Sequence, residues 1–185
     1  MNKPRFTKKR FHKMCDMAEV SEQLVADYMN EKSSNSKDFI IVDKATQKAG
    51  IKDGWHIPDL TREDGKMVEV KEDFSSAWTG NIAIEKNCLE RMLAYCDAND
   101  KPYPLLASVN HKEYSVLFFR TEGLLEQLDD MANKNQIWLT KGGDLDEWNY
   151  IVNLEFAKSF CAFYDNVNFP KLAKPLLKGR KTPNS

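Results

Sequence analysis

The sequence lacks the features that would place it in a membrane, in an oxidising compartment or around a zinc ion. No apolar run approaches the roughly 20 residues of a membrane-spanning helix, and the basic N-terminal stretch lacks the apolar segment of a signal peptide. The histidines are few and scattered, and no CxxC pair occurs among the four cysteines, Cys15, Cys88, Cys96 and Cys161. This pattern favours buried free thiols over disulfides or zinc ligands. We therefore expect a cytoplasmic protein that does not associate with membranes.

The composition is that of a folded chain with one core. Hydrophobic residues make up 42% of the sequence, and the 4 Trp, 6 Tyr and 10 Phe argue against disorder. A length of 185 residues is most simply one domain. We expect a basic N-terminal arm at 1–13, a domain at 14–169 and a basic tail at 170–185.

The net charge of -1 conceals an uneven distribution. Residues 1–13 contain six Lys or Arg and residues 170–185 contain five, and neither stretch contains an acid. Basic arms suit a nucleic-acid backbone, because each phosphate contact releases counterions. Lys8, Lys9 and Arg10 are therefore candidate nucleic-acid-binding residues. The alternative is that the two tails only increase solubility.

Two short apolar runs, 56–60 and 67–71, are separated by a polar connection that contains Asp64 and Gly65. An Asp-Gly pair is typical of a tight hairpin turn, so the runs are predicted to pair as antiparallel strands. Side chains two apart in a strand share a face, which puts Glu69 and Lys71 on one side of the sheet. Asp59, on the neighbouring strand, can then lie opposite them.

Two carboxylates and a lysine at the end of a sheet suit metal-assisted hydrolysis. Close carboxylate oxygens repel one another unless a hard cation such as Mg²⁺ lies between them. A lysine beside the cation can orient an attacking water, and the cation offsets charge that builds up on a phosphate. The alternative is an ordinary surface hairpin whose polar face carries salt-bridged charges.

The motif resembles that of the PD-(D/E)xK nuclease family, with Pro58 and Asp59, nine intervening residues, and then Glu69, Val70 and Lys71. The resemblance covers about residues 14–120 as an order of elements. It implies a core of a helix, three strands, a helix and a strand, with the motif on the second and third strands.

The resemblance also implies roles for these residues. Asp59, Glu69 and the Val70 carbonyl would ligate Mg²⁺, with Mn²⁺ as an alternative ion, and Lys71 would place the water. A glutamate on the first helix adds a metal ligand in several branches of the family. Glu22 is the best match for it here, and Glu19 is the second choice.

Before the motif, hydrophobic periodicity predicts a helix at 14–31 and a strand at 38–43. Residues 44–54 are expected to be an irregular basic loop, in which Lys48 and Lys52 could contact a nucleic-acid backbone. The second strand is expected to start at Trp55. His56 is interpreted as a strand-edge residue and not as a ligand.

After the motif, Thr79 to Asn81 is interpreted as a loop or an extension of the third strand that brings Gly80 close to a substrate. Thr79 and Asn81 are therefore candidate nucleic-acid-binding residues. Trp78 could stack on a base or lie in the interior. A helix is predicted at 84–97, and Glu85 in its first turn is attributed to the helix dipole and not to catalysis.

The last third of the chain is predicted to contain a hairpin, 105–109 with 114–120, followed by a helix capped by Thr121. A short strand at 137–139, a strand at 150–154 and a helix at 155–164 complete the elements, although helix and strand are hard to separate after residue 144. The aromatic residues of this region are assigned to the core, with a subunit contact as the alternative.

Together these observations predict an α/β fold with a mixed central sheet flanked by helices, similar to a restriction endonuclease. The predicted function is Mg²⁺-dependent hydrolysis of phosphodiester bonds in DNA. The main alternative is a catalytically inactive module that binds nucleic acid or protein. Family members that cut both strands are normally dimers, so a homodimer is an alternative to a monomer.

Overall fold

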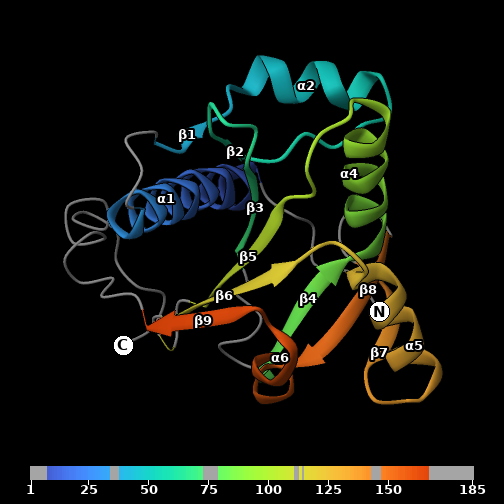
Figure 1. The fold of residues 1–185 in the computed structure, drawn as a ribbon. Coiled ribbons are helices and arrows are strands. Elements are labelled where there is room, and N and C mark those ends of the chain that lie inside the picture. The colour runs from blue at the N-terminus through green and yellow to red at the C-terminus, as the bar shows by residue number, and fades with distance from the viewer. Residues whose placement is uncertain are drawn as a thin grey trace.

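The structure is a computed structural model that describes residues 8–33, 38–72, 79–110, 113, 115–142 and 147–166, with side chains from residue 18 onward. Within these residues the chain forms two β-sheets and five helices (Figure 1). The helices are α1 (Lys8–Lys32), α2 (Lys44–Lys52), α4 (Lys86–Ala98), α5 (Leu124–Asn133) and α6 (Leu154–Phe160). The fold is therefore mixed α/β, as the sequence predicted.

The larger sheet has six strands in the order β1-β2-β3-β5-β6-β9. These strands are β1 (Ile40–Ile41), β2 (Leu60–Thr61), β3 (Met67–Glu72), β5 (Leu105–Asn110), β6 (Ser115–Arg120) and β9 (Phe163–Asn166). β3 and β5 are parallel, and every other neighbouring pair is antiparallel. In chain order, α1, β1, β2, β3, α4 and β5 follow the expected order of a helix, three strands, a helix and a strand, which is confirmed. Two further elements are inserted, α2 after β1 and a strand of the second sheet before α4.

The smaller sheet has the order β4-β8-β7, with β4 (Asn81–Glu85), β8 (Glu147–Asn153) and β7 (Trp138–Gly142). Figure 1 shows it beside α5 and below α4. Both of its neighbouring pairs are antiparallel. The segment around Asn81, expected to be a loop or part of the third strand, is thus a separate strand whose partner lies some seventy residues later in the chain, at Asn153.

The core has two parts, one on each face of the larger sheet. On one face, α1 packs Leu24 and Val25 against Val68 and Val70 of β3. On the other, Phe119 of β6 packs with residues of the second sheet, α4 and α5, among them Ile82, Met92, Leu128 and Tyr150. The period-two alternation of β3 therefore directs its valines to α1 and leaves Glu69 and Lys71 on the opposite face.

The predicted hairpin is present. Leu60 pairs with Val68 and Thr61 with Met67. Gly65 has φ +86°, and the Arg62 amide donates to the Lys66 carbonyl at 2.8 Å. The turn is wider than the predicted tight one. Gly65 is its one residue with a positive φ, and Asp64 accepts two hydrogen bonds from the Arg62 guanidinium.

Residues 44–54 were predicted to be irregular, and this is wrong. They form α2, whose N-terminal amides, Ala45 and Thr46, donate to the Asp43 side chain at 3.0 Å each. The cap satisfies amides that have no partner within the helix. The second strand consequently begins at Leu60, not at Trp55.

Two predictions for the last third of the chain also need correction. Gly123, with φ +71°, precedes α5, while the predicted cap Thr121 donates its hydroxyl to the Pro104 carbonyl at 2.7 Å. Of the aromatic residues assigned to the core, Tyr150 is fully buried, but the exposed fractions of Trp148, Phe163 and Tyr164 are 44%, 41% and 52%. The predicted helix 155–164 ends at Phe160. Phe163 and Tyr164 belong instead to β9, the edge strand of the larger sheet.

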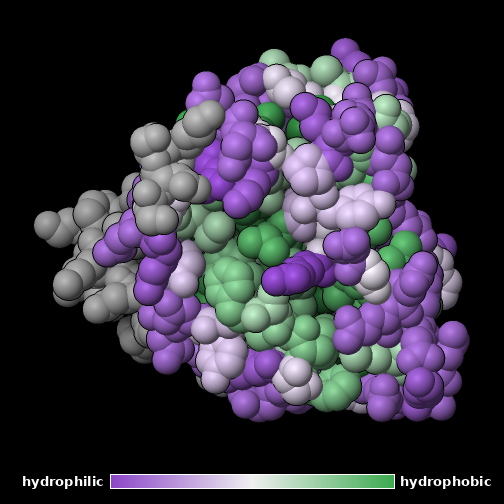
Figure 2. Space-filling view, in the orientation of Figure 1, coloured by the Kyte–Doolittle hydropathy of each residue, from purple (hydrophilic) through white to green (hydrophobic). Residues whose placement is uncertain are grey.

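The surface in Figure 2 is polar at its margins and hydrophobic over the middle of this face, where β5 and β6 lie in Figure 1. Among the described residues, no helix combines the length and apolarity needed to cross a membrane. Trp78, the tail at 170–185 and most of the region around residue 144 lie outside the described residues. The division into two basic arms and a domain, and the homodimer, stay predictions.

Candidate metal and active site

Asp59 lies immediately before β2, where continuation of the β2–β3 register places it opposite Glu69. Its Oδ2 accepts from the Val70 amide at 2.9 Å, and its Oδ1 accepts from Gln47 Nε2, on α2, at 2.9 Å. Burial and the nearby Glu69 charge raise the pKa of Asp59 to about 7, against the opposing effect of the Val70 hydrogen bond. A carboxylate held this way is easily stabilised by a cation.

Glu69, in the middle of β3, has an exposed fraction of only 1%. Its Oε1 lies 2.7 Å from His56 Nε2 and 3.0 Å from Lys71 Nζ. Burial alone would raise the pKa of Glu69, but the charges of Lys71 and His56 outweigh it and lower the pKa to about 2. Its Oε2 has no hydrogen-bond partner among the described residues.

Lys71 connects Glu69 to a further acid. Its Nζ lies 3.1 Å from Oε2 of Glu85, at the end of β4, as well as 3.0 Å from Glu69. Burial would lower the pKa of Lys71, but the Glu69 charge raises it well above the usual value. Glu85, which the sequence assigned to the helix dipole, makes no side-chain cap to α4 and instead pairs with this lysine.

Glu22 reaches the site from α1. It is 5% exposed, and both of its oxygens accept from Lys44 Nζ, at 2.9 and 3.2 Å. The Glu22 charge contributes to the raised pKa of Asp59, after burial and Glu69. Glu19, the second choice from the sequence, is exposed. Glu22 of α1 is therefore close enough to Asp59 to affect its charge.

The backbone of Val70 faces Asp59. Its amide donates to that carboxylate, so this residue directs its polar backbone groups toward β2. The N–H and C=O of one residue in an extended strand point to the same edge. The Val70 carbonyl therefore points to the edge on which Asp59 lies.

The sequence did not identify two residues of this site. His56, interpreted as a strand-edge residue, lies in the connection between α2 and β2 and contacts Glu69 directly. Cys88, in the first turn of α4, donates its thiol to the same oxygen at 3.7 Å. The glutamate charge raises the pKa of His56 to about 10 despite burial, which acts to lower it. No spacing rule connects residues 56, 69 and 88, so only the folded chain shows this group.

The candidate nucleic-acid residues are dispersed. Lys48 and Lys52 are exposed on α2, four residues apart and in line with Lys44. Thr79 is exposed, and its Oγ1 accepts from the amide of Asn81, the first residue of β4. The remaining candidates, Lys8, Lys9 and Arg10, lie in the first turn of α1, and their side chains are outside the described part.

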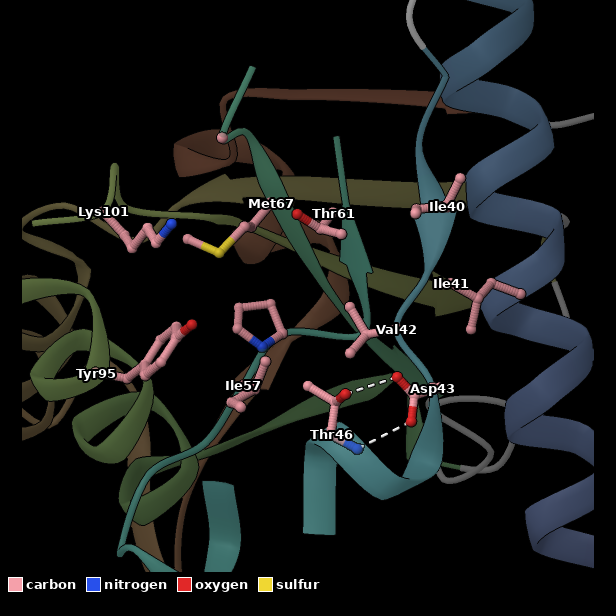
Figure 3. A pocket seen from close by; sticks show the side chains of 12 residues that line it. Ile40, Ile41, Val42, Asp43, Thr46, Ile57, Thr61, Met67, Tyr95 and Lys101 are labelled. Atoms are coloured by element: carbon pink, nitrogen blue, oxygen red, sulfur yellow. Dashed lines mark hydrogen bonds between the residues drawn. The ribbon is translucent and has the colours of Figure 1, made fainter. Parts of the chain in front are cut away.

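A pocket of about 340 Å³ lies next to the site, between β1, the first turn of α2 and the C-terminal part of α4 (Figure 3). Figure 3 shows Ile41 and Val42 on one side of it and Tyr95 and Lys101 on the other. Pro58, which precedes Asp59, lines it, but Asp59, Glu69 and Lys71 do not. The pocket therefore lies beside the carboxylates, which do not line it.

Comparison with known proteins gives distant similarity at the level of structure. No protein-family profile and no curated protein sequence matches the chain. The solved structure of a nuclease from a fusselovirus is similar over 96% of this chain and 96% of that one, with a TM-score of 0.45 and 12% sequence identity. At this level of similarity, the functional argument rests on the residues described above.

Proposed function

We propose that the chain is a Mg²⁺-dependent nuclease that hydrolyses phosphodiester bonds in DNA. The observation that carries the proposal is the position of Asp59, immediately before β2 and opposite Glu69 of β3 when the register is continued, with Lys71 bound to the second carboxylate. Burial and the Glu69 charge raise the pKa of Asp59 to about 7, so the charged form of this carboxylate is disfavoured in the folded chain. Perturbed carboxylates of this kind gather at functional sites.

The residues present fit a hard divalent cation. Mg²⁺ prefers carboxylate, carbonyl and water oxygens. Asp59, Oε2 of Glu69 and the Val70 carbonyl offer three such oxygens, and the glutamate oxygen has no partner in the described residues. Glu22 would hold a second position, where the Lys44 ammonium now bonds both of its oxygens.

A bound cation would polarise the phosphate and lower the pKa of a bound water. The chain's own groups support that chemistry in separate ways. Gln47 and the Val70 amide fix the Asp59 carboxylate in one orientation. Lys71, anchored between Glu69 and Glu85, presents an ammonium that orients the attacking water and stabilises charge on the phosphate.

A polyanionic substrate is supported by the lysines of α2. Lys44, Lys48 and Lys52 recur every four residues and so lie along one face of the helix. The first contacts Glu22 and the other two are exposed, which gives a row of positive charge that leads away from the carboxylates. A DNA backbone along α2 would place its phosphates beside the site.

The test is cleavage of supercoiled plasmid by the purified full chain with Mg²⁺, with and without a chelator. We expect nicking that the chelator stops, and a loss of roughly a hundredfold or more in Asp59→Asn and Glu69→Gln, because each removes a charge that the cation needs. Glu63→Gln, which alters an exposed acid of the same hairpin, should cut like the wild type. Cleavage by Asp59→Asn at the wild-type rate contradicts the proposal.

One observation favours the alternative of an inactive binding module. Two of the three acids, Glu22 and Glu69, already have a cationic partner within the chain, Lys44 and Lys71 respectively. A purely structural network would bind plasmid without cutting it under any ion. Binding without nicking in the same experiment therefore identifies the module.

A further inference from the structure

Two side chains from separate segments converge on one carboxylate oxygen of a third residue. Glu69 Oε1, on β3, lies 2.7 Å from His56 Nε2 and 3.7 Å from Cys88 Sγ. One nitrogen, one oxygen and one sulfur from these residues all lie within 4.8 Å of one another. Ligand atoms around one tetrahedral zinc ion are about 3.3 to 3.8 Å apart, so small side-chain adjustments would bring all three onto one ion.

We propose that His56, Glu69 and Cys88 form a binding site for a thiophilic divalent cation such as Zn²⁺, separate from the Mg²⁺ position and sharing only Glu69 with it. A thiolate and an imidazole select zinc over magnesium, which takes oxygen ligands. Three protein ligands, with one position left for water, is the number found in open zinc sites.

The carboxylate of Glu69 has a second oxygen that the proposed site does not use. This side chain is 1% exposed, and its Oε2 has no hydrogen-bond partner among the described residues. Leaving a buried carboxylate oxygen unpaired is costly. Oε1 faces the nitrogen and sulfur donors, which leaves Oε2 for the Mg²⁺ position, so one carboxylate serves both sites.

Access and charge are also suitable. The His56 side chain is 22% exposed, whereas Cys88 and Glu69 are buried, so solvent reaches the group at His56. The ion would replace the proton shared by His56 and Glu69 and the thiol proton of Cys88. Lys71, which would lose Oε1 of Glu69 to the ion, has a second partner 3.1 Å away in Glu85.

Occupation of this site should inhibit the nuclease, a consequence that rests on the proposed function. The ion would take Oε1 of Glu69 as a ligand, in place of the contact that this oxygen makes with Lys71. The carboxylate that holds Mg²⁺ and the ammonium that orients water would then no longer be positioned together. Zinc would act as an inhibitor and not as a substitute for magnesium.

Binding is tested by titrating the full chain with Co²⁺, a spectroscopic substitute for Zn²⁺ that shows a thiolate charge-transfer band. The wild type should bind one equivalent with this band. Cys88→Ser should lose the band, and both Cys88→Ser and His56→Gln should bind at least about tenfold more weakly. Cys96→Ser removes another buried free thiol of α4 and should match the wild type.

A wild type without the thiolate band, or a band that persists in Cys88→Ser, overturns the site. If circular dichroism shows that Cys88→Ser is unfolded, His56→Gln decides: unchanged cobalt affinity overturns the site, and weakened affinity supports it. Zinc added to Mg²⁺-driven plasmid cleavage should inhibit the wild type and spare Cys88→Ser. A chain that binds cobalt but never cuts refutes the nuclease function alone.

Discussion

At the scale of single residues, the site is defined by two neighbouring carboxyl groups whose pKa values are shifted in opposite directions. Burial and the Glu69 charge raise the pKa of Asp59 to about 7. The charges of Lys71 and His56 outweigh burial and lower the pKa of Glu69 to about 2. The two pKa values differ because only Glu69 has cationic partners in direct contact. Asp59 is therefore the group that most needs an added cation.

Asp59→Asn should stabilise the protein at pH 8 in the absence of divalent ions. The raised pKa means that the folded state binds the Asp59 proton more tightly than the unfolded state does, so this group reduces stability as pH rises from about 4 to about 7. The asparagine can still accept from Val70 and pair with Gln47. We expect a gain on the order of 2–4 kcal/mol at pH 8 and little change at pH 4, measured by urea unfolding. A less stable variant at pH 8 would contradict this.

His56 should remain protonated well above neutral pH. The Glu69 charge, which outweighs burial, raises the pKa of His56 to about 10. Its stabilising effect is thus fully present below about pH 6.5 and is lost as pH rises through about 10. Nuclear magnetic resonance of the imidazole, assigned with His56→Gln, should show an imidazolium at pH 8. Titration near pH 6.5 would mean that the contact with Glu69 is absent in solution.

At the scale of elements, α2 positions two site residues with a single cap. The Asp43 side chain accepts from the Ala45 and Thr46 amides, and Lys44 and Gln47 follow within the first turn of the helix. These two residues bond Glu22 and Asp59. The first turn of α2 therefore holds two acids of the site, Glu22 and Asp59, through its own side chains.

Asp43→Ala should destabilise the protein by about 1 kcal/mol, the usual cost of removing an N-cap. Amide hydrogen exchange should increase over residues 44–47, since the capping bonds are lost there. Asp43→Asn keeps an oxygen at the same place and serves as the matched control. Equal protection in Asp43→Ala and the wild type would show that tertiary contacts alone hold this turn.

The sequence predicted the hairpin because its signal is local. Alternation over 67–71 and the glycine at 65 determine faces and register without help from the rest of the chain. It did not predict α2, which has no long apolar stripe and depends on its cap and on contacts to distant acids. It misassigned β4, whose neighbour β8 follows much later in the chain. It also placed Asp59, Glu69 and Lys71 on adjacent strands, but the His56 and Cys88 contacts arise only from tertiary folding.

At the scale of the whole molecule, the fold brings a basic helix face beside an acidic site. α2 lies across the end of α4 and next to the strands that carry Asp59 and Glu69 (Figure 1). The near-zero net charge of the chain does not reveal this local arrangement. Binding of a polyanion should therefore depend on particular lysines and not on overall charge.

Replacing Lys48 and Lys52 together by Ala should weaken DNA binding for all sequences alike. If each contacts one phosphate, the slope of log affinity against log salt should fall by about 1.8. Lys66, in the turn before β3, and Lys134, the C-cap of α5, are exposed lysines that give a matched control pair and should leave affinity unchanged. Fluorescence anisotropy at several salt concentrations measures both quantities. An unchanged slope would exclude α2 from the interface.

The central claim, that Asp59 and Glu69 share a hard cation, is tested most directly by calorimetric titration of Mg²⁺ or Mn²⁺ without any nucleic acid. We predict that the wild type and Cys88→Ser bind the ion equally, and that Asp59→Asn and Glu69→Gln bind it at least about tenfold more weakly. Wild-type affinity in Asp59→Asn would contradict the account, because the ion would then be held elsewhere.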